Sequence, residues 1–154
     1  MPACPWQPVD LLPHDPPMLL LDRVIAHDAE GAVAEADLGA GHPFAKPQGV
    51  PAHVGLELMA QACGVHTGTL ARMGGSEVRL GFLLGTRNYQ ARQAWFPLGA
   101  TLRIEARQVF AEDGMGVYDC RVLLDGEVVA QAQLSCFQPE DTGAVLGKMR
   151  GNDV

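Results

Sequence analysis

The sequence lacks the motifs that mark several large classes of enzyme. It has no G-x-G-x-x-G dinucleotide fingerprint, no phosphate-binding loop and no G-x-S-x-G nucleophile elbow. Its four cysteines, Cys4, Cys63, Cys120 and Cys136, form no C-x-x-C pair and no zinc-like spacing. Cys63 and Cys120 stand among apolar residues, so we predict that they are reduced core thiols.

The chain also lacks an excess of positive charge and any long apolar run. A net charge of −7 and a pI near 5.1 argue against a nucleic-acid partner. No apolar stretch approaches the roughly 18 residues that a membrane span requires. The start, MPACPWQPVDLLPHDPP, has neither the basic region nor the apolar run of a signal peptide. We therefore expect a soluble, cytoplasmic protein with no membrane span.

The composition and the apolar pattern indicate one globular domain over residues 1–154. Hydrophobic residues make up 47% and charged residues 19%, which is typical of a chain that buries a core. Alternating or branched runs bounded by turn residues predict six strands, at 18–28, 32–38, 78–89, 101–111, 115–124 and 127–137. The core should span about residues 11–139, with a loose polar tail over 140–154.

One helix is predicted between the second and third strands. Pro51 suits a first helical turn, and the apolar pattern can run to about Met73 before two glycines stop it. Apolar residues occupy all sides of this helix rather than one narrow stripe, so it should be buried. The fold class is therefore α+β, with an antiparallel sheet wrapped around one long central helix.

Glu57 is the one charged side chain in the apolar first half of this helix. A buried carboxylate must be paired, hydrogen-bonded or protonated, because an isolated buried charge is very costly. Either it faces a pocket and titrates there, or it turns to solvent or to a structural arginine such as Arg87 or Arg92. His53 lies four residues earlier and Gln61 four residues later, so all three share one helix face.

The start of the helix is a second candidate chemical element. Free N–H groups near Ala52 to Gly55 would form a positive end that can hold a thioester carbonyl, unless Gly55 only allows close packing. His53 is either a catalytic residue or an exposed histidine of the first turn. His42, in the loop sequence GHPF, is either catalytic or hydrogen-bonded to the backbone. The other histidines, His14, His27 and His66, are interpreted as structural.

Five segments in the same order resemble one known family. They are LLPHDPPMLLLDRV (11–24), ELMAQ (57–61), GFLLGTRNY (81–89), WFPLGATLRIEARQV (95–109) and DGEVVAQAQLSCFQP (125–139). Together they are similar to the hotdog-fold 3-hydroxyacyl-acyl-carrier-protein dehydratases, and most of all to a divergent branch found in aryl-polyene lipid gene clusters. The resemblance covers about residues 11–139.

The resemblance implies a dimer that joins two sheets edge to edge, with substrate tunnels at the interface. It also implies a catalytic histidine before the helix and a carboxylate on the helix, typically from opposite subunits. Glu57 falls on the carboxylate position. The sequence departs at the histidine, because the G-H-F-P-G stretch of the familiar dehydratases is absent. His53, or failing that His42, is then the candidate base for the α-proton, while Glu57 handles the proton of the leaving hydroxyl.

The function that this resemblance implies is dehydration of a 3-hydroxyacyl thioester in fatty-acid or polyene lipid biosynthesis, without a cofactor or metal. The substrate would be carried on the phosphopantetheine of acyl carrier protein or on coenzyme A. The tunnel residues that we expect to contact it are Gly55, Gln61, Gly64, Phe82, Leu83 and Gly85. A basic rim for the carrier is a further expectation, from Arg72, Arg79, Arg87 and Arg92.

Two alternatives remain open at this point. A thioesterase on the same fold needs only a carboxylate that activates water and a helix end for the oxyanion. A weakly active subunit that supports a related dehydratase in a heterodimer is the other. The assembly is accordingly expected to be a homodimer, a higher oligomer or such a heterodimer.

Overall fold

A computed structural model describes residues 1–13, 18–76, 78 and 81–138 of the chain. A short helix, α1 (Pro8–Leu11), is followed by strands β1 (Arg23–His27) and β2 (Gly31–Asp37). The long helix α2 (Val54–Met73) comes next, after the two-residue strand β3 (Val50–Pro51). The remaining strands are β4 (Phe82–Ala91), β5 (Trp95–Phe96), β6 (Thr101–Glu112), β7 (Met115–Leu124) and β8 (Glu127–Phe137).

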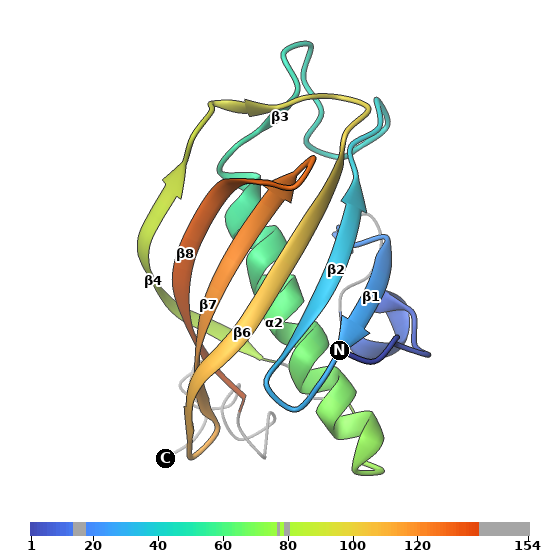
Figure 1. Cartoon of the computed structure of the whole chain (residues 1–154), viewed down its shortest axis with the longest axis vertical. Coiled ribbons are helices and arrows are strands. Elements are labelled where there is room, and N and C mark those ends of the chain that lie inside the picture. Colours follow the sequence, from blue (N-terminus) through green and yellow to red (C-terminus); the bar gives the residue numbers. More distant parts are fainter. Residues whose placement is uncertain (14–17, 77, 79–80, 139–154) are drawn as a thin grey trace, which may run out of the picture.

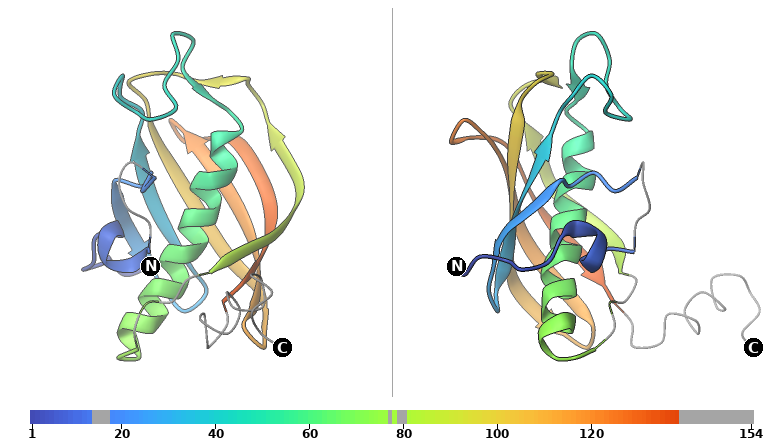
Figure 2. Two further views of the ribbon diagram at one scale, coloured as in Figure 1. Left: turned by 180° about the vertical axis from the view of Figure 1, so that it is seen from behind. Right: turned by 90° about the vertical axis from the view of Figure 1, so that its right-hand side faces the viewer.

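The main sheet has six strands in the order β1-β2-β6-β7-β8-β4, and each pair of neighbours is antiparallel. The sheet curves, and α2 crosses its concave face obliquely (Figure 1; Figure 2, right). Strands β1 and β4 form its two edges. The predicted α+β hotdog fold, with one long helix against an antiparallel sheet, is confirmed.

The core lies between α2 and the inner face of the sheet. Along β6 the inward residues Leu102, Ile104 and Ala106 are buried and alternate with exposed Thr101 and Arg103. This period of two is what a strand with one buried face requires. On the helix the largest buried apolar side chains are Leu58 and Met59, both fully covered. The helix therefore supplies the second layer of one continuous core.

The N-terminal segment packs on the side of α2 that the sheet leaves open (Figure 2). A Cβ atom on Gly68 would lie 2.6 Å from the carbonyl oxygen of Leu11, so only glycine allows this approach. Arg72 donates to the carbonyl oxygen of Asp10 at 2.8 Å. These contacts hold α1 against the second half of α2.

The structure corrects the predicted start of the helix. Val50 and Pro51 form β3, which pairs with Trp95 and Phe96 of β5, and α2 begins only at Val54. The Ala52 N–H then donates to the Ala94 carbonyl, so pairing with a distant segment holds this stretch out of the helix. No periodicity in the sequence predicts a two-residue strand pair.

The predicted strand ends shift by a few residues at both edges of the sheet. The first strand begins at Arg23 rather than at residue 18, and β4 covers Phe82–Ala91 rather than 78–89. The predicted loose tail of 140–154 lies outside the described residues, as do His14 and Arg79. None of the helices within the described ranges is long and apolar enough to cross a bilayer.

An ion pair on the outer face of the sheet predicts a pH effect. Hydrogen bonds from Arg23 and from Thr101 lower the pKa of Asp37 to about 2, below its ordinary 3.8. A lowered pKa in the folded state stabilises the protein above about pH 4, and this contribution is lost as the pH falls toward 2. We expect Asp37→Asn to be less stable than the parent at pH 7, with the difference shrinking over that window. Urea midpoints measured from pH 7 to pH 2 check this; a constant difference would contradict it.

Candidate active site

A cavity of about 620 Å³ lies along one face of α2. The helix lines it with Glu57, Ala60, Cys63, Gly64 and Thr67, which recur at the spacing of one helical face. The other walls come from Leu11–Pro13, the start of β4, β7, β8 and the β6–β7 hairpin. Ten residues separate Glu57 from Thr67, so this face is about 15 Å long. Such a volume is ordinary for a small-molecule site.

Glu57 is half-buried and lies on the wall of the cavity. Its Oε1 accepts a hydrogen bond from Gln61 Nε2 at 3.1 Å. A carboxylate that borders an apolar cavity and accepts a hydrogen bond from an amide can exchange a proton with a bound molecule. A cavity therefore adjoins the carboxylate, as a catalytic role requires.

Gln61 is buried and is occupied by the N-terminal segment. It accepts from the Leu20 N–H at 2.9 Å and donates to the Met18 carbonyl at 2.8 Å, as well as to Glu57. It does not line the cavity. Gln61 thus orients Glu57 and ties the segment before β1 to α2, and its predicted contact with substrate stays a prediction.

The two candidate histidines lie outside the cavity wall. His53 is the exposed residue that precedes α2, and its backbone is already helical. His42 is half-buried in the loop before β3, where its Nδ1 accepts from the Phe44 N–H at 3.1 Å. Burial lowers the pKa of His42, so the ring is neutral and carries its proton on Nε2. In this arrangement His42 has no free lone pair with which to act as a base. None of the described residues that line the cavity is a histidine.

The N–H groups at the start of α2 are less free than the sequence suggested. Ala52 donates to Ala94, and Gly55 donates to the Ala52 carbonyl at 3.0 Å. Gly55 is buried against Tyr89 and Phe96, where a Cβ atom would collide with the Tyr89 hydroxyl. Gly55 thus allows Tyr89 and Phe96 to pack closely and does not line the cavity, and its predicted contact with substrate stays a prediction.

The other predicted contact residues divide between the cavity and the sheet edge. Gly64 and Leu83 line the cavity. Gly85 is exposed on β4 and has open space above its Cα. Phe82 opens β4, paired with Phe137. Their substrate contacts remain predictions, and the cavity lies nearer the middle of α2 than its start.

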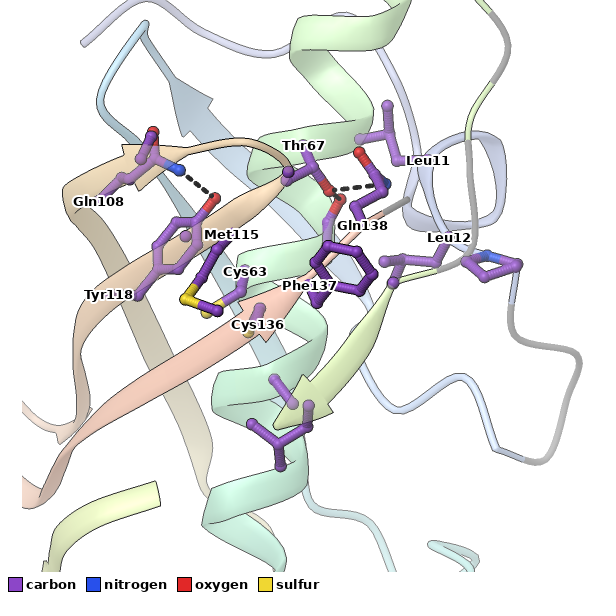
Figure 3. A pocket seen from close by; sticks show the side chains of 18 of the residues that line it. Leu11, Leu12, Cys63, Thr67, Gln108, Met115, Tyr118, Cys136, Phe137 and Gln138 are labelled. Carbon is purple, nitrogen blue, oxygen red and sulfur yellow. Dashed lines mark hydrogen bonds between the residues drawn. The ribbon is translucent and has the colours of Figure 1, made fainter. Parts of the chain in front are cut away.

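Sequence reasoning missed a polar group at the far end of the cavity. Tyr118 and Gln108 line it there, and Gln108 Nε2 donates to the Tyr118 hydroxyl at 3.3 Å (Figure 3). The same hydroxyl lies 2.6 Å from His66 Nδ1, while His66 Nε2 lies 3.0 Å from the Ala29 carbonyl. A carbonyl can only accept, so His66 is protonated on Nε2 and Tyr118 donates to Nδ1. Burial lowers the pKa of His66 and raises that of Tyr118.

The alternation of inward-facing residues along β6 and β7 could have predicted from the sequence that Tyr118 and Gln108 face the interior. Tyr118 stands two residues before Cys120, and Gln108 stands two residues after Ala106, so each continues a buried face. The structural interpretation of His66 agrees with its place in this network.

The arginines proposed as a basic rim do not gather at one place. Arg72 is held by the Asp10 carbonyl, whereas Arg87 and Arg92 are exposed on β4 and just after it. Within the described part of the chain, His, Cys, Asp and Glu side chains form no group of three that could hold a metal.

Comparison with known proteins decides the family. The model of the ApeP-like family, described as ApeP dehydratase, matches residues 6–147. The chain belongs to the ApeP-like dehydratase family. It is also 31% identical over 136 residues to a 3-hydroxyacyl-[acyl-carrier-protein] dehydratase FabZ from Bartonella quintana. That match covers 84% of this chain and 85% of the relative.

Solved structures agree with the family and the fold. The dehydratase heterocomplex ApeI:P from Xenorhabdus doucetiae matches with a TM-score of 0.86 and 25% identity, covering 92% of this chain and 96% of that one. The PaaI protein from E. coli shares the fold at a TM-score of 0.56 and 17% identity, covering 74% and 80%. The chain is therefore a 3-hydroxyacyl thioester dehydratase of the hotdog fold, a lyase.

Proposed function

We propose that this chain removes water from a 3-hydroxyacyl thioester carried on the phosphopantetheine of acyl carrier protein, giving a trans-2-enoyl thioester. The observation that carries the proposal is Glu57, a half-buried carboxylate on the wall of a long, largely apolar cavity. The dehydratase family and the acyl-carrier-protein substrate named for the FabZ relative support the same reaction. The cytoplasm, where we expect the protein, suits a carrier-bound substrate.

The elimination needs one acid, one base and no cofactor. The base takes the α-proton next to the thioester carbonyl, and the acid protonates the 3-hydroxyl as it leaves as water. We assign the acid to Glu57, to which the Gln61 amide donates a hydrogen bond at 3.1 Å. The apolar walls around Leu11, Leu83 and Phe137 would hold the acyl chain.

We assign the base to a second subunit. Strand β4 is an edge of the sheet and exposes Leu83 and Leu84, so another sheet can add to it. His53 is exposed just before α2 and is therefore accessible to a second chain. In a dimer across β4, the second copy's His53 would serve the cavity that holds Glu57. Assembly with a related dehydratase would supply a histidine in the same way, and the neighbouring ApeI:P structure is such a heterocomplex by its name.

The test is incubation of the purified full chain with a 3-hydroxyacyl thioester on acyl carrier protein and, separately, on coenzyme A. We expect conjugated enoyl thioester to accumulate, detected by ultraviolet absorbance and mass spectrometry, without release of free thiol. Faster turnover of the carrier-protein substrate supports the assigned carrier. Free thiol without enoyl product would overturn the proposal in favour of thioester hydrolysis.

A further inference from the structure

Three of the four cysteines meet on the inner side of the fold, although they are far apart in the sequence. Cys63 comes from α2, Cys120 from β7 and Cys136 from β8. The Sγ atoms of Cys63 and Cys120 are 3.6 Å apart, and the Cys136 side chain lies near enough to Cys63 to raise its pKa. All three are free thiols, and Cys63 and Cys136 both line the cavity.

The three thiols differ in their access to the cavity. Cys63 and Cys136 line it (Figure 3), whereas Cys120 is buried and is not among the lining residues. Cys136 is the half-buried member of the cluster. A small polar oxidant that enters the cavity therefore meets Cys136 first, with Cys63 directly beside it.

The pKa values of Cys136 and Cys63 are shifted in opposite directions, so the two thiols differ in reactivity. The hydrogen bond from Cys63 lowers the pKa of Cys136, although burial opposes it. Burial raises the pKa of Cys63 well above its ordinary value. The thiolate is the reactive form of cysteine, so Cys136 is the thiol that reacts and Cys63 stays protonated as the neighbouring donor.

We propose that Cys136 and Cys63 form a redox-modification site in the wall of the cavity, with a hydroperoxide as the oxidant. The Cys136 thiolate attacks one peroxide oxygen and the O–O bond breaks. The hydroxide that leaves takes up the proton lost when the thiol ionised, so the products from hydrogen peroxide are a Cys136 sulfenic acid and water. The Cys63 sulfur then attacks the sulfenic sulfur, and its proton leaves with the hydroxyl as a second water. The two cysteines are oxidised to a disulfide while one peroxide is reduced.

A Cys63–Cys136 disulfide would affect dehydration because it would lie in the wall of the substrate cavity. Cys63 stands between Glu57 and Thr67 on the helix face of the cavity, and a bond to β8 crosses the space beside it. We expect it to impede the acyl chain and so to reduce dehydration reversibly. This consequence rests on the proposed function, whereas the thiol chemistry does not.

The chemistry is tested on the purified full chain with hydrogen peroxide, followed by intact mass and peptide mapping. We expect a loss of about 2 Da per chain, reversed by dithiothreitol, and a cross-linked peptide pair that joins Cys63 to Cys136. Cys136→Ser should slow the loss of free thiols about tenfold and abolish the pair. A Cys63–Cys120 linkage, or equally fast oxidation of Cys136→Ser, would overturn the proposal.

Two matched variants control for disturbance of the core. Cys120→Ala removes the third thiol of the cluster, and Cys4→Ser removes the cysteine outside it; both should still form the Cys63–Cys136 bond. Loss of the bond in Cys120→Ala, with its circular dichroism unchanged, would contradict the assignment of partners. Dehydration by the parent should fall on oxidation and return on reduction, whereas the rate of Cys136→Ser after oxidation should equal the rate of the same variant before oxidation. Disulfide formation without loss of an otherwise measurable activity would overturn the effect on the site alone. A chain that forms the disulfide but has no dehydratase activity would instead count against the proposed function.

Discussion

Replacing Glu57 by glutamine is expected to lower kcat for dehydration about 100-fold or more. The substitution keeps the size of the side chain and its capacity to hydrogen-bond Gln61, but it removes the group that can transfer a proton. Binding of the acyl thioester should change little, because the apolar walls of the cavity are untouched. Steady-state rates of enoyl formation and KM, measured with the same substrate, separate the two effects.

The matched control is Glu127→Gln, which makes the same chemical change at the exposed start of β8. It should leave the rate within about twofold of the parent, since isolated surface changes away from the site are usually small. The unfolding midpoint of Glu57→Gln should stay near that of the parent. Full activity in this variant would refute a catalytic role for the carboxylate.

Mixing two inactive variants tests the shared site. If His53 of one copy serves Glu57 of the other, His53→Phe should also be inactive when pure. Randomly mixed dimers of Glu57→Gln and His53→Phe chains should then regain up to about a quarter of the parental activity, because half the dimers hold one intact site. Full activity in pure His53→Phe would exclude His53 as the base and leave a histidine of a related subunit. Two inactive variants that regain nothing on mixing would contradict sharing between copies.

The largest loss of stability is expected from a substitution in the core of the fold. Leu58 is fully buried on α2 next to Glu57, where it packs into the core against the sheet. Leu58→Ala removes buried apolar atoms and leaves a cavity, so it should lower the free energy of unfolding by about 2–5 kcal/mol. Urea or guanidinium unfolding, with a common m-value for parent and variant, measures the change.

Met73→Ala on the same helix is the matched control. Met73 is 65% exposed at the end of α2, and its truncation should change stability by less than about 0.5 kcal/mol. A loss at Leu58 no larger than that at Met73 would contradict the central place of the helix in the core.

Much of the fold follows from local patterns in the sequence. The strands β6, β7 and β8 lie within one residue of the predicted ranges, because their alternation and the Asp125-Gly126 turn are local signals. The helix end at Met73 follows from the two glycines after it. The predicted start of the helix was wrong, because Val50 and Pro51 pair with residues 95–96 and no local pattern encodes such a contact.

The candidate site divides in the same way. The sequence by itself determined that Glu57 is a carboxylate in a buried helix, and the family resemblance predicted that it takes the position of the family's carboxylate. Only the tertiary structure decided what its neighbours do. Gln61 lies on the same helical stripe as Glu57, yet its amide is taken by backbone groups about forty residues earlier in the chain.

The sequence also could not predict which residues from distant segments contact the cysteines and the histidines. Cys63, Cys120 and Cys136 come together because α2 crosses the inner faces of β7 and β8, and the crossing is set by packing of the whole sheet. His53 precedes Glu57 by one turn but lies outside the cavity, which opens farther along the helix. Spacing along a chain fixes which residues share a helix face, whereas the surrounding walls, built from residues far away in sequence, decide which part of that face borders a cavity.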